Sequence, residues 1–372
     1  MNLGELSIRT AIVRFLCISI AFRAEFSAGV AAYKRGDFTA AIAEFSALAE
    51  TSDARAQFAL GLLYDNGEGV VSDPEQALHW YSKSAEQGYA KAQYNLALLY
   101  SDDQSSRADP ELARHWFIRA AESGNADGVA WLRNAADTND VDAQFRLGRM
   151  YLRARGVPRD DSEGFRWVHQ AAQSDHLEAS YLLAVIYENG RGVARAYHDA
   201  ASWYTTASQR GSMEATYNLA RLNRLGRGVQ RDLNMSQKLY VQAAEAGLLE
   251  AQLSLAMLYE AGQGWSRDPA AALRWYLAAA KGGNVDAQIN LAYLYAEGIG
   301  VAKDLVDSFA WYSVAAVTGH PAAIGNLSVL QQALSSVQIE AAKIRASALR
   351  QSVEHYGMGR HNVAAGADLL GR

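Results

Sequence analysis

The chain has one cysteine and 5 prolines among 372 residues. Because that cysteine, Cys17, lies in an apolar N-terminal stretch, the remainder offers no thiol for a disulfide, a nucleophile or a thiolate metal site. No apolar run reaches the roughly 18 residues of a membrane span, so we expect no stable membrane insertion. The formal charge of -5 provides no basic field for a phosphate backbone, and nucleic acid is not an expected partner.

Familiar enzyme signatures are also missing from the sequence, which has no HExxH, GxSxG or GxxxxGK[ST] motif. His79 and His115 occupy the same place before Trp80 and Trp116, and we interpret them as repeat consensus rather than as metal ligands. Gly-x-Gly pairs follow helical patterns instead of strands, which favours turns over phosphate-binding loops. We therefore expect no enzyme activity, no metal and no cofactor.

Glycine and apolar residues, by contrast, are plentiful. The 30 glycines and the 50% of hydrophobic residues predict helices separated by glycine turns. An Ala-Gln pair or its equivalent recurs along the chain, and internal repetition of this kind indicates an array of small units. The repeats start at Ala56, Ala92, Ala143, Ala179, Ala215, Ala251 and Ala287. Successive starts are 36 residues apart, except that the step from Ala92 to Ala143 is 51 and leaves room for an inserted helix.

Each repeat contains two helical patterns. In the first, a leucine four residues after the start is followed by apolar residues three and four positions later, as at Leu60 and Leu63, which is the spacing of one helix face. A Gly-x-Gly turn ends this helix. An aspartate then predicts the N-cap of the second helix. These aspartates are Asp73, Asp109, Asp160, Asp232, Asp268 and Asp304.

The second pattern carries a tryptophan followed four and five positions later by small residues. We expect the small residues to let a neighbouring helix approach, and each tryptophan to fill the resulting space in the core. On this interpretation Trp203→Ala lowers thermal stability. The tryptophans are Trp80, Trp116, Trp167, Trp203, Trp275 and Trp311.

The repeat AQFALGLLYDNGEGVVSDPEQALHWYSKSAEQG, which begins at Ala56, resembles the Sel-one-like repeat (SLR), a relative of the tetratricopeptide repeat. The resemblance extends to about Gly319 and implies an all-α fold, a right-handed α/α superhelical solenoid of helix-turn-helix repeats. Departures are the residues 101–107 in place of a glycine turn, Asn223 and Leu239 in place of two aromatics, and the insertion. We expect the insertion to divide the array near residue 140.

The pattern and the resemblance together divide the chain into segments. We expect a signal peptide at 1–24, a tetratricopeptide-like cap at 25–55, repeats at 56–125, an inserted helix at 126–142, repeats at 143–322, a degenerate repeat with a capping helix at 323–355, and a disordered tail at 356–372.

The first of these segments bears on localisation. Arg9 and Arg14 precede the apolar run Phe15 to Phe22, which is followed by small residues suited to cleavage. The alternative is an amphipathic first helix, because Glu5 and Arg14 are unusual for a signal peptide. We favour export to the periplasm or outside the cell; without cleavage the protein would be cytoplasmic.

Candidate binding residues come from two patterns. The position three after each repeat start carries asparagine in several repeats, and an amide can both donate to and accept from a peptide backbone. Arginines gather in the middle repeats, where their planar groups could pair with an acidic partner. The competing interpretations are a repeat-consensus asparagine and a solvated charged face. The candidates are Asn95, Arg146, Arg149, Asn218, Arg221, Arg224, Asn290 and Asn326.

The resemblance implies a bacterial, non-enzymatic scaffold or adaptor that binds a protein or peptide, with envelope signalling, exopolysaccharide regulation or secretion as its settings. One alternative is a glycan-binding or cell-wall-binding scaffold that would use Trp265, which stands in a turn where valine is usual. A cell-wall or β-lactam hydrolase is the other alternative, but no nucleophile with a base can be located for it.

Overall fold

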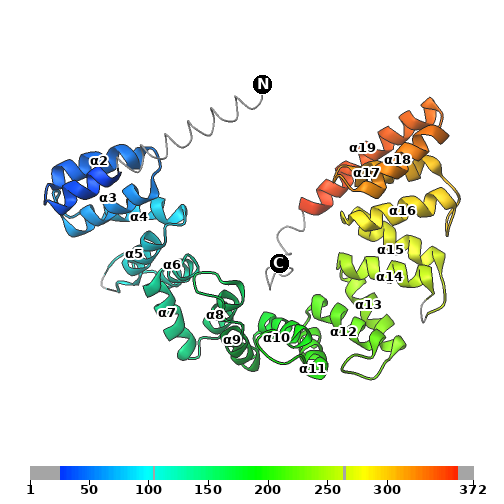
Figure 1. Ribbon diagram of the computed structural model, residues 1–372, viewed down its shortest axis with the longest axis horizontal. Helices are drawn as coiled ribbons and strands as arrows, with labels where there is room; N and C mark the ends of the chain where they lie inside the picture. Colours follow the sequence, from blue (N-terminus) through cyan, green and yellow to red (C-terminus); the bar gives the residue numbers. More distant parts are fainter. Residues whose placement is uncertain (1–25, 104, 263–264, 359–372) are drawn as a thin grey trace, which may run out of the picture. The chain divides into compact units, whose positions relative to one another are not determined.

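The computed structural model describes residues 26–103, 105–262 and 265–358. In these ranges the regular elements are α-helices joined by short turns (Figure 1). The all-α repeat solenoid predicted from the sequence is therefore confirmed. The predicted signal peptide at 1–24 and residues 359–372 of the predicted tail lie outside the described residues.

The repeat pattern defines which helices are equivalent. The first helices of the repeats are α3 (Ala54–Asn66), α5 (Ala90–Ser101), α8 (Val141–Arg153), α10 (Leu177–Asn189), α12 (Met213–Leu225), α14 (Leu249–Ala261), α16 (Val285–Glu297) and α18 (Pro321–Ala333). The second helices are α4 (Pro74–Glu86), α6 (Pro110–Glu122), α9 (Asp161–Gln173), α11 (Tyr197–Gln209), α13 (Leu233–Glu245), α15 (Pro269–Lys281) and α17 (Leu305–Ala316). Outside this alternation are residues 26–34, α2 (Phe38–Glu50), α7 (Ala126–Asp137) and α19 (Ser336–Met358).

Aspartates begin the second helices as predicted. The Asp73 carboxylate accepts hydrogen bonds from the backbone N–H groups of Glu75 and Gln76, while Pro74 occupies the first turn, where its missing N–H costs nothing. The carboxylates of Asp109, Asp232, Asp268 and Asp304 cap their helices in the same way. These contacts explain why aspartate recurs before most second helices; α11 instead follows Ala196, which makes no side-chain cap.

The Ala-Gln pair that marks each repeat has a packing role. Ala56 is fully buried, and the adjacent Gln57 donates from Nε2 to the carbonyl oxygen of Ala49 at 3.1 Å. A glutamine thus satisfies a carbonyl near the end of the preceding helix, which water cannot reach. Gln93, Gln144, Gln252 and Gln288 each make the equivalent bond to a residue eight positions earlier.

The chain divides into two compact units between Asp160 and Asp161. The predicted division near residue 140 is therefore wrong. Its premise was that the inserted helix interrupts the stacking, but α7 packs against both α6 and α8. The turn after α8 also lies close to the end of α6, because a Cβ on Gly156 would come within 2.1 Å of the Ala121 carbonyl oxygen. The first unit thus stays continuous through the insertion.

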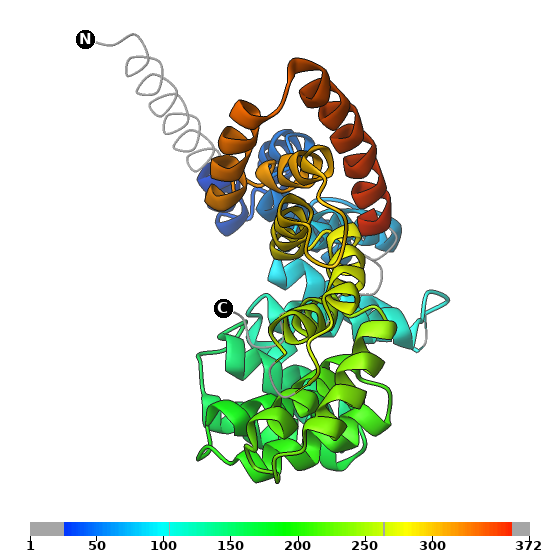
Figure 2. The ribbon, with the colours of Figure 1, turned by 90° about the vertical axis from the view of Figure 1, so that its right-hand side faces the viewer.

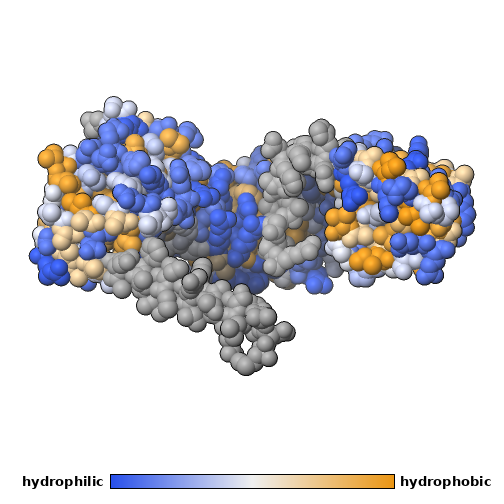
Figure 3. Space-filling view, turned by 90° about the horizontal axis from the view of Figure 1, so that it is seen from above, coloured by the Kyte–Doolittle hydropathy of each residue, from blue (hydrophilic) through white to orange (hydrophobic). Residues whose placement is uncertain are grey.

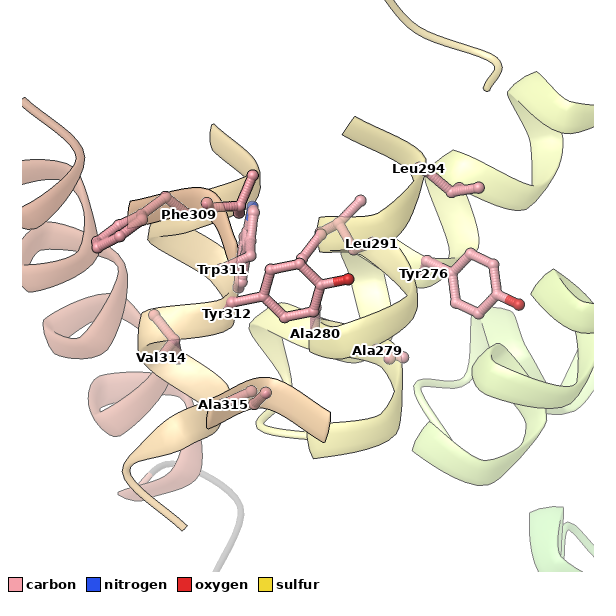
Figure 4. Close-up of a cluster of buried hydrophobic side chains, with 14 of the residues drawn as sticks. Tyr276, Ala279, Ala280, Leu291, Leu294, Phe309, Trp311, Tyr312, Val314 and Ala315 are labelled. Atoms are coloured by element: carbon pink, nitrogen blue, oxygen red, sulfur yellow. The ribbon is translucent and has the colours of Figure 1, made fainter. Parts of the chain in front are cut away.

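In most repeats the core is built around an aromatic residue that comes one position after the tryptophan. Tyr81, Tyr204 and Tyr276 are at most 1% exposed, whereas Trp203 and Trp275 are only partly buried. The expectation that every tryptophan fills the core is therefore wrong, although Trp167 and Trp311 are buried. Figure 4 shows Tyr276 and Tyr312 among the alanines and leucines of α15, α16 and α17.

The geometric reason is the small residue that faces this tyrosine. A Cβ on Gly61 of α3 would lie 2.5 Å from the Tyr81 ring, so the ring packs directly on the helix backbone. Alanine takes the same place in other first helices, as at Ala184 and Ala256, both fully buried. The aromatic ring and the small residue opposite it together set the close approach of the paired helices.

The second unit ends in a helix that leaves the repeat pattern. α19 packs on α17 and α15, and Figure 2 shows α17 lying between α18 and α19. Apolar surface is visible over these C-terminal helices (Figure 3), where Val317, Val337 and Ile344 are each more than 60% exposed. In the described part of the chain no helix is both long and apolar enough to cross a membrane.

Candidate partner-binding surface

Three of the four predicted asparagines interact with tyrosine hydroxyls inside the array. In the first unit, Asn95 donates from Nδ2 to the Tyr81 hydroxyl at 3.1 Å, and that hydroxyl donates to Asp65 Oδ2 at 3.1 Å. In the second unit, Asn218 donates to the Tyr181 hydroxyl at 3.4 Å. A hydrogen bond from Asn290 opposes the rise in the pKa of Tyr276 that burial causes. These amides therefore have a structural contact, which leaves their remaining donor and acceptor capacity for a peptide.

The remaining asparagine, Asn326, lies half-buried on α18. It is three residues after Ala323, which is fully buried like the alanines that start the other repeats. The sequence therefore keeps the register of the first helix here, even though the second helix of this repeat is replaced by α19.

The predicted arginines of the second unit also make internal contacts. Arg221 donates from Nη2 to both carboxylate oxygens of Glu188, at 2.6 and 2.7 Å, and Tyr204 donates to the same carboxylate at 2.8 Å. Glu188 thus compensates the charge of Arg221, and the Tyr204 hydroxyl has a carboxylate acceptor although its ring is buried.

Arg224 stands where other repeats place a carboxylate beside the core tyrosine, as Glu188 and Glu260 do. A hydrogen bond from Arg224 to Tyr240 opposes the rise in the pKa of Tyr240 that burial causes. The backbone carbonyl oxygen of Arg224 accepts a hydrogen bond from Arg231 Nε at 3.2 Å. The guanidinium of Arg227 lies 5.6 Å from the centroid of the Tyr197 ring. The second-unit arginines named here therefore contribute to packing within and between repeats.

The first helices expose one face in a regular way. Counted from each repeat start, the third, sixth and tenth residues fall on the same side of the helix, and the sixth is an exposed apolar residue in four first helices. These residues are Leu98 (44% exposed), Met257 (51%), Tyr293 (47%) and Val329 (65%). We call the third, sixth and tenth positions the first-helix face.

Neighbouring first helices are linked beside this face. The hydroxyls of Tyr217 on α12 and Ser254 on α14 lie 3.1 Å apart, and the bond between Asn218 and Tyr181 joins α12 to α10. The first-helix face of the second unit therefore extends over consecutive repeats. The sequence analysis predicted Arg149 and Arg221 at the sixth position but not its exposed apolar residues, which lie one helical turn after the asparagine position and could have been found by extending that column.

Helix α8 is unlike the other first helices because arginine occupies all three positions of its face. These residues, Arg146, Arg149 and Arg153, line a surface pocket with Arg155, Met150 and Glu122. We call the four arginines the α8 arginine cluster. The structure thus brings together Arg146 and Arg149, which the sequence predicted as binding residues, and adds Arg155 from the following turn.

The charges in the α8 arginine cluster are unevenly compensated. Arg146 pairs through Nε with Asp142 Oδ2 at 2.8 Å, and Arg155 pairs through Nη2 with Glu122 Oε2 at 3.0 Å. Between them, Arg149 Nε is buried with no hydrogen-bond acceptor among the described residues. Burial lowers the pKa of Arg149 and repulsion from Arg153, Arg146 and Arg155 lowers it further, while the nearby Glu122 carboxylate opposes this shift. Its guanidinium lies 5.4 Å from the centroid of the Phe145 ring.

The two ends of α8 position these side chains. At the start, the Asp140 carboxylate accepts from the Ala143 backbone N–H at 3.0 Å. At the end, Ala154 and Gly156 adopt left-handed backbone conformations, with φ of 54° and 74°. This turn brings Arg155 back toward Glu122 at the end of α6. The pocket is therefore built from the C-terminal ends of α6 and α8.

An ion pair at the start of α8 makes its stability depend on pH. Both terminal nitrogens of Arg114 donate to the Asp140 carboxylate, and these bonds hold the pKa of Asp140 below its ordinary value of 3.8. A lowered folded-state pKa contributes stability that is complete above the unfolded pKa and is lost as pH falls through the folded one.

We therefore expect Asp140→Asn to lower the free energy of unfolding at neutral pH by about 1–2 kcal/mol, because asparagine keeps the N-cap but loses the ion pair. The difference from the wild type should shrink as the pH falls below the ordinary carboxyl pKa of 3.8 and should vanish once Asp140 is protonated in the folded protein. Thermal unfolding of both proteins across this pH range measures it. Equal stability at neutral pH would show that the pair contributes nothing.

The structure also places the residues of the alternative interpretations. His79 and His115 are exposed beside Trp80 and Trp116, and no cluster of three metal-binding side chains occurs in the described ranges. Trp265, the candidate for a glycan platform, donates from its indole N–H to the Leu233 carbonyl oxygen at 3.2 Å and packs against Tyr240 and Tyr259. Its ring is thus partly buried and packs against the core.

Comparison with known proteins locates relatives of the same repeat. The Sel1 repeat model matches residues 54–89, 90–125, 141–176, 177–212, 214–248, 249–284 and 285–316, more than half of the chain. A crystal structure of a Sel1 repeat protein from Oxalobacter formigenes is 30% identical, with a TM-score of 0.52, over 87% of this chain and 91% of that one.

A protective antigen with an SLR fold from uropathogenic Escherichia coli is 24% identical, with a TM-score of 0.31, over 98% of both chains. A comparison with curated proteins finds no match.

Proposed function

The chain belongs to the Sel1 repeat family, and from this premise we propose that it is a non-enzymatic scaffold that binds a segment of a partner protein along its first-helix face. Sel1 repeats are protein-interaction modules, and proteins built from them commonly mediate protein–protein interactions and are generally not catalytic. The architecture suits this role because stacked repeats create an extended surface that no single repeat has.

One observation carries the proposal: apolar side chains are exposed at the same position of consecutive first helices. Met257, Tyr293 and Val329 on α14, α16 and α18 are 51%, 47% and 65% exposed. Isolated exposed apolar residues need no explanation, but a row of them in register offers a partner a continuous apolar contact. Polar residues alongside this row, such as Asn290, would supply hydrogen bonds to the partner backbone.

The experiment that tests this proposal changes the row without changing the core. We expect the double substitution Met257→Glu and Tyr293→Glu to reduce capture of specific partners by the tagged full-length protein about tenfold, because a carboxylate would be placed in an apolar contact. Proteins retained from the source cells would be quantified by mass spectrometry and then tested as purified components.

Val71→Glu is the matched control, since Val71 is 89% exposed in the turn before α4 and is not one of the residues of the first-helix face. Circular dichroism would show that both variants keep their helices. If wild type and double variant retain the same proteins in equal amounts, the first-helix face of the second unit does not bind them.

The cellular setting is a further part of the proposal. We propose a bacterial protein that is exported to the periplasm or beyond and acts in an envelope process such as signalling, exopolysaccharide regulation or secretion. The support is the sequence alone, in which Arg9 and Arg14 precede the apolar run Phe15 to Phe22. An intact Met1 in the mass of the mature protein would argue for a cytoplasmic adaptor instead.

A further inference from the structure

The α8 arginine cluster is the place where the described first unit concentrates positive charge without full compensation. Three arginines occupy consecutive turns of one helix face, and a fourth comes from the adjacent turn. Each of the outer two, Arg146 and Arg155, has one carboxylate, whereas the central Arg149 has a buried Nε with no acceptor among the described residues. A guanidinium that is partly removed from water without a carboxylate partner is unfavourable, and an incoming anion would compensate its charge.

The contacts on either side of Arg149 orient the cluster. Asp142 holds Arg146 from the preceding turn, and Glu122 holds Arg155 from the end of α6. The ring of Phe145 lies under the Arg149 guanidinium. An arginine fork that is already oriented loses less side-chain entropy when it binds a planar oxyanion. The arrangement therefore favours a carboxylate approaching Arg149 over dispersed solvent ions.

The chemistry and size of the cluster indicate what it would bind. Resting on the proposed scaffold function, we propose that the α8 arginine cluster binds the carboxylates of an acidic, extended segment of the partner protein. From Arg146 to Arg153 is seven residues, or about 10 Å along a helix. Carboxylates on alternate residues of an extended chain recur about every 6.6 Å, so two of them fit along the cluster.

A protein segment is favoured over a nucleic acid by the charge of the whole chain. The formal net charge is -5, which repels a long polyanion, whereas a short acidic segment interacts mainly with the local cluster. The cluster also lies on the first-helix face, the same face that carries the exposed apolar Leu98 on α5 of this unit. Acidic residues of the partner segment would thus contact the α8 arginine cluster, and apolar residues of the same segment would contact Leu98.

The test uses the full-length protein and a labelled synthetic peptide in which three glutamates alternate with serines. We expect the peptide to bind with an affinity that falls as salt rises, and the double substitution Arg146→Gln and Arg149→Gln to weaken binding at least about tenfold. A peptide with glutamine in place of glutamate should not bind. Fluorescence anisotropy would measure all of these affinities.

Arg119→Gln is the matched control, because Arg119 is an exposed arginine of the same unit on second helix α6. It should change peptide affinity less than about twofold, the size of a screened surface charge effect. Circular dichroism and thermal unfolding of both variants would show whether the fold is retained.

Three outcomes would overturn the proposal: equal peptide binding by the double variant and the wild type, equal binding of the glutamine peptide, or binding of inorganic phosphate to the cluster without binding of the acidic peptide. None of these outcomes depends on the row that contains Met257 and Tyr293, which lies in the second unit. Loss of capture by substitutions in that row would leave the scaffold function standing while this assignment failed.

Discussion

Tyr204→Ala is expected to lower the free energy of unfolding by about 3–5 kcal/mol, the cost of removing a buried aromatic ring from a packed core. Tyr204 is 1% exposed, packs among fully buried alanines of α10 and α11, and donates its hydroxyl to Glu188. Removing the ring leaves a cavity and deprives Glu188 of one hydrogen-bond donor. Thermal and denaturant unfolding followed by circular dichroism measure the effect.

Two neighbouring substitutions serve as controls for this result. Trp203→Ala should cost clearly less than Tyr204→Ala, because Trp203 is only partly buried at the edge of the same cluster. Tyr204→Phe keeps the ring and should cost about 1 kcal/mol, the usual net contribution of one hydrogen bond. If Trp203→Ala proved the more destabilising change, the assignment of the core to the tyrosine position would be wrong.

Gly228→Ala is expected to destabilise the second unit by about 3 kcal/mol or more, because two costs combine. Gly228 has φ of 73°, where an alanine loses about 1–2 kcal/mol, and its Cβ would come within 2.1 Å of the Tyr197 carbonyl oxygen. The clash is with backbone at the start of α11, which cannot move aside like a flexible side chain. Strain of this kind belongs to the few mechanisms that give large effects.

Gly319→Ala separates the two costs. Gly319 has a similar φ of 78°, but no atom lies within 4 Å of an added Cβ, so only the conformational cost of about 1–2 kcal/mol should appear. Both variants would be compared with the wild type by thermal unfolding. Equal losses in the two variants would mean that the turn after α12 can shift away from α11.

Much of the fold could be predicted because its physical signals are local and repeated. The aspartate before most second helices and the glycine after many first helices act within one turn of chain, so a single sequence displays them. Repetition then reduces error, since the same residue type at 36-residue intervals shows that the position is structurally constrained. The Ala-Gln pair is an example, although its hydrogen bond to the preceding helix became visible only in the structure.

The choice of core aromatic was not predictable in this way. Trp203 and Tyr204 are adjacent, and a large aromatic residue occupies each of these two positions in most repeats. Which of the two faces Ala184 depends on the rotation of α11 about its axis, which is set by packing between helices. The general preference for burying tryptophan favoured the wrong residue here.

The candidate site shows the same limit. Arg149 and Arg221 occupy equivalent positions in their repeats and look alike in the sequence. Arg221 Nη2 meets Glu188, which lies 33 residues away, whereas Arg149 has no ion pair with a carboxylate among the described residues. The Nε atoms of both arginines are buried without an acceptor there. An arginine is compensated only if the fold places a carboxylate within about 4 Å of it, and this distance cannot be derived from the sequence.

The sequence by itself determined the class of this protein: an all-α array with a known period, one insertion and no recognisable catalytic motif. Those features follow from helix periodicity, capping and repetition, which are encoded over a few residues at a time. Only the tertiary structure decided which aromatic forms the core, where the two units divide and which arginines have partners. These depend on the rotation and stacking of helices, and so on contacts between residues far apart in the chain.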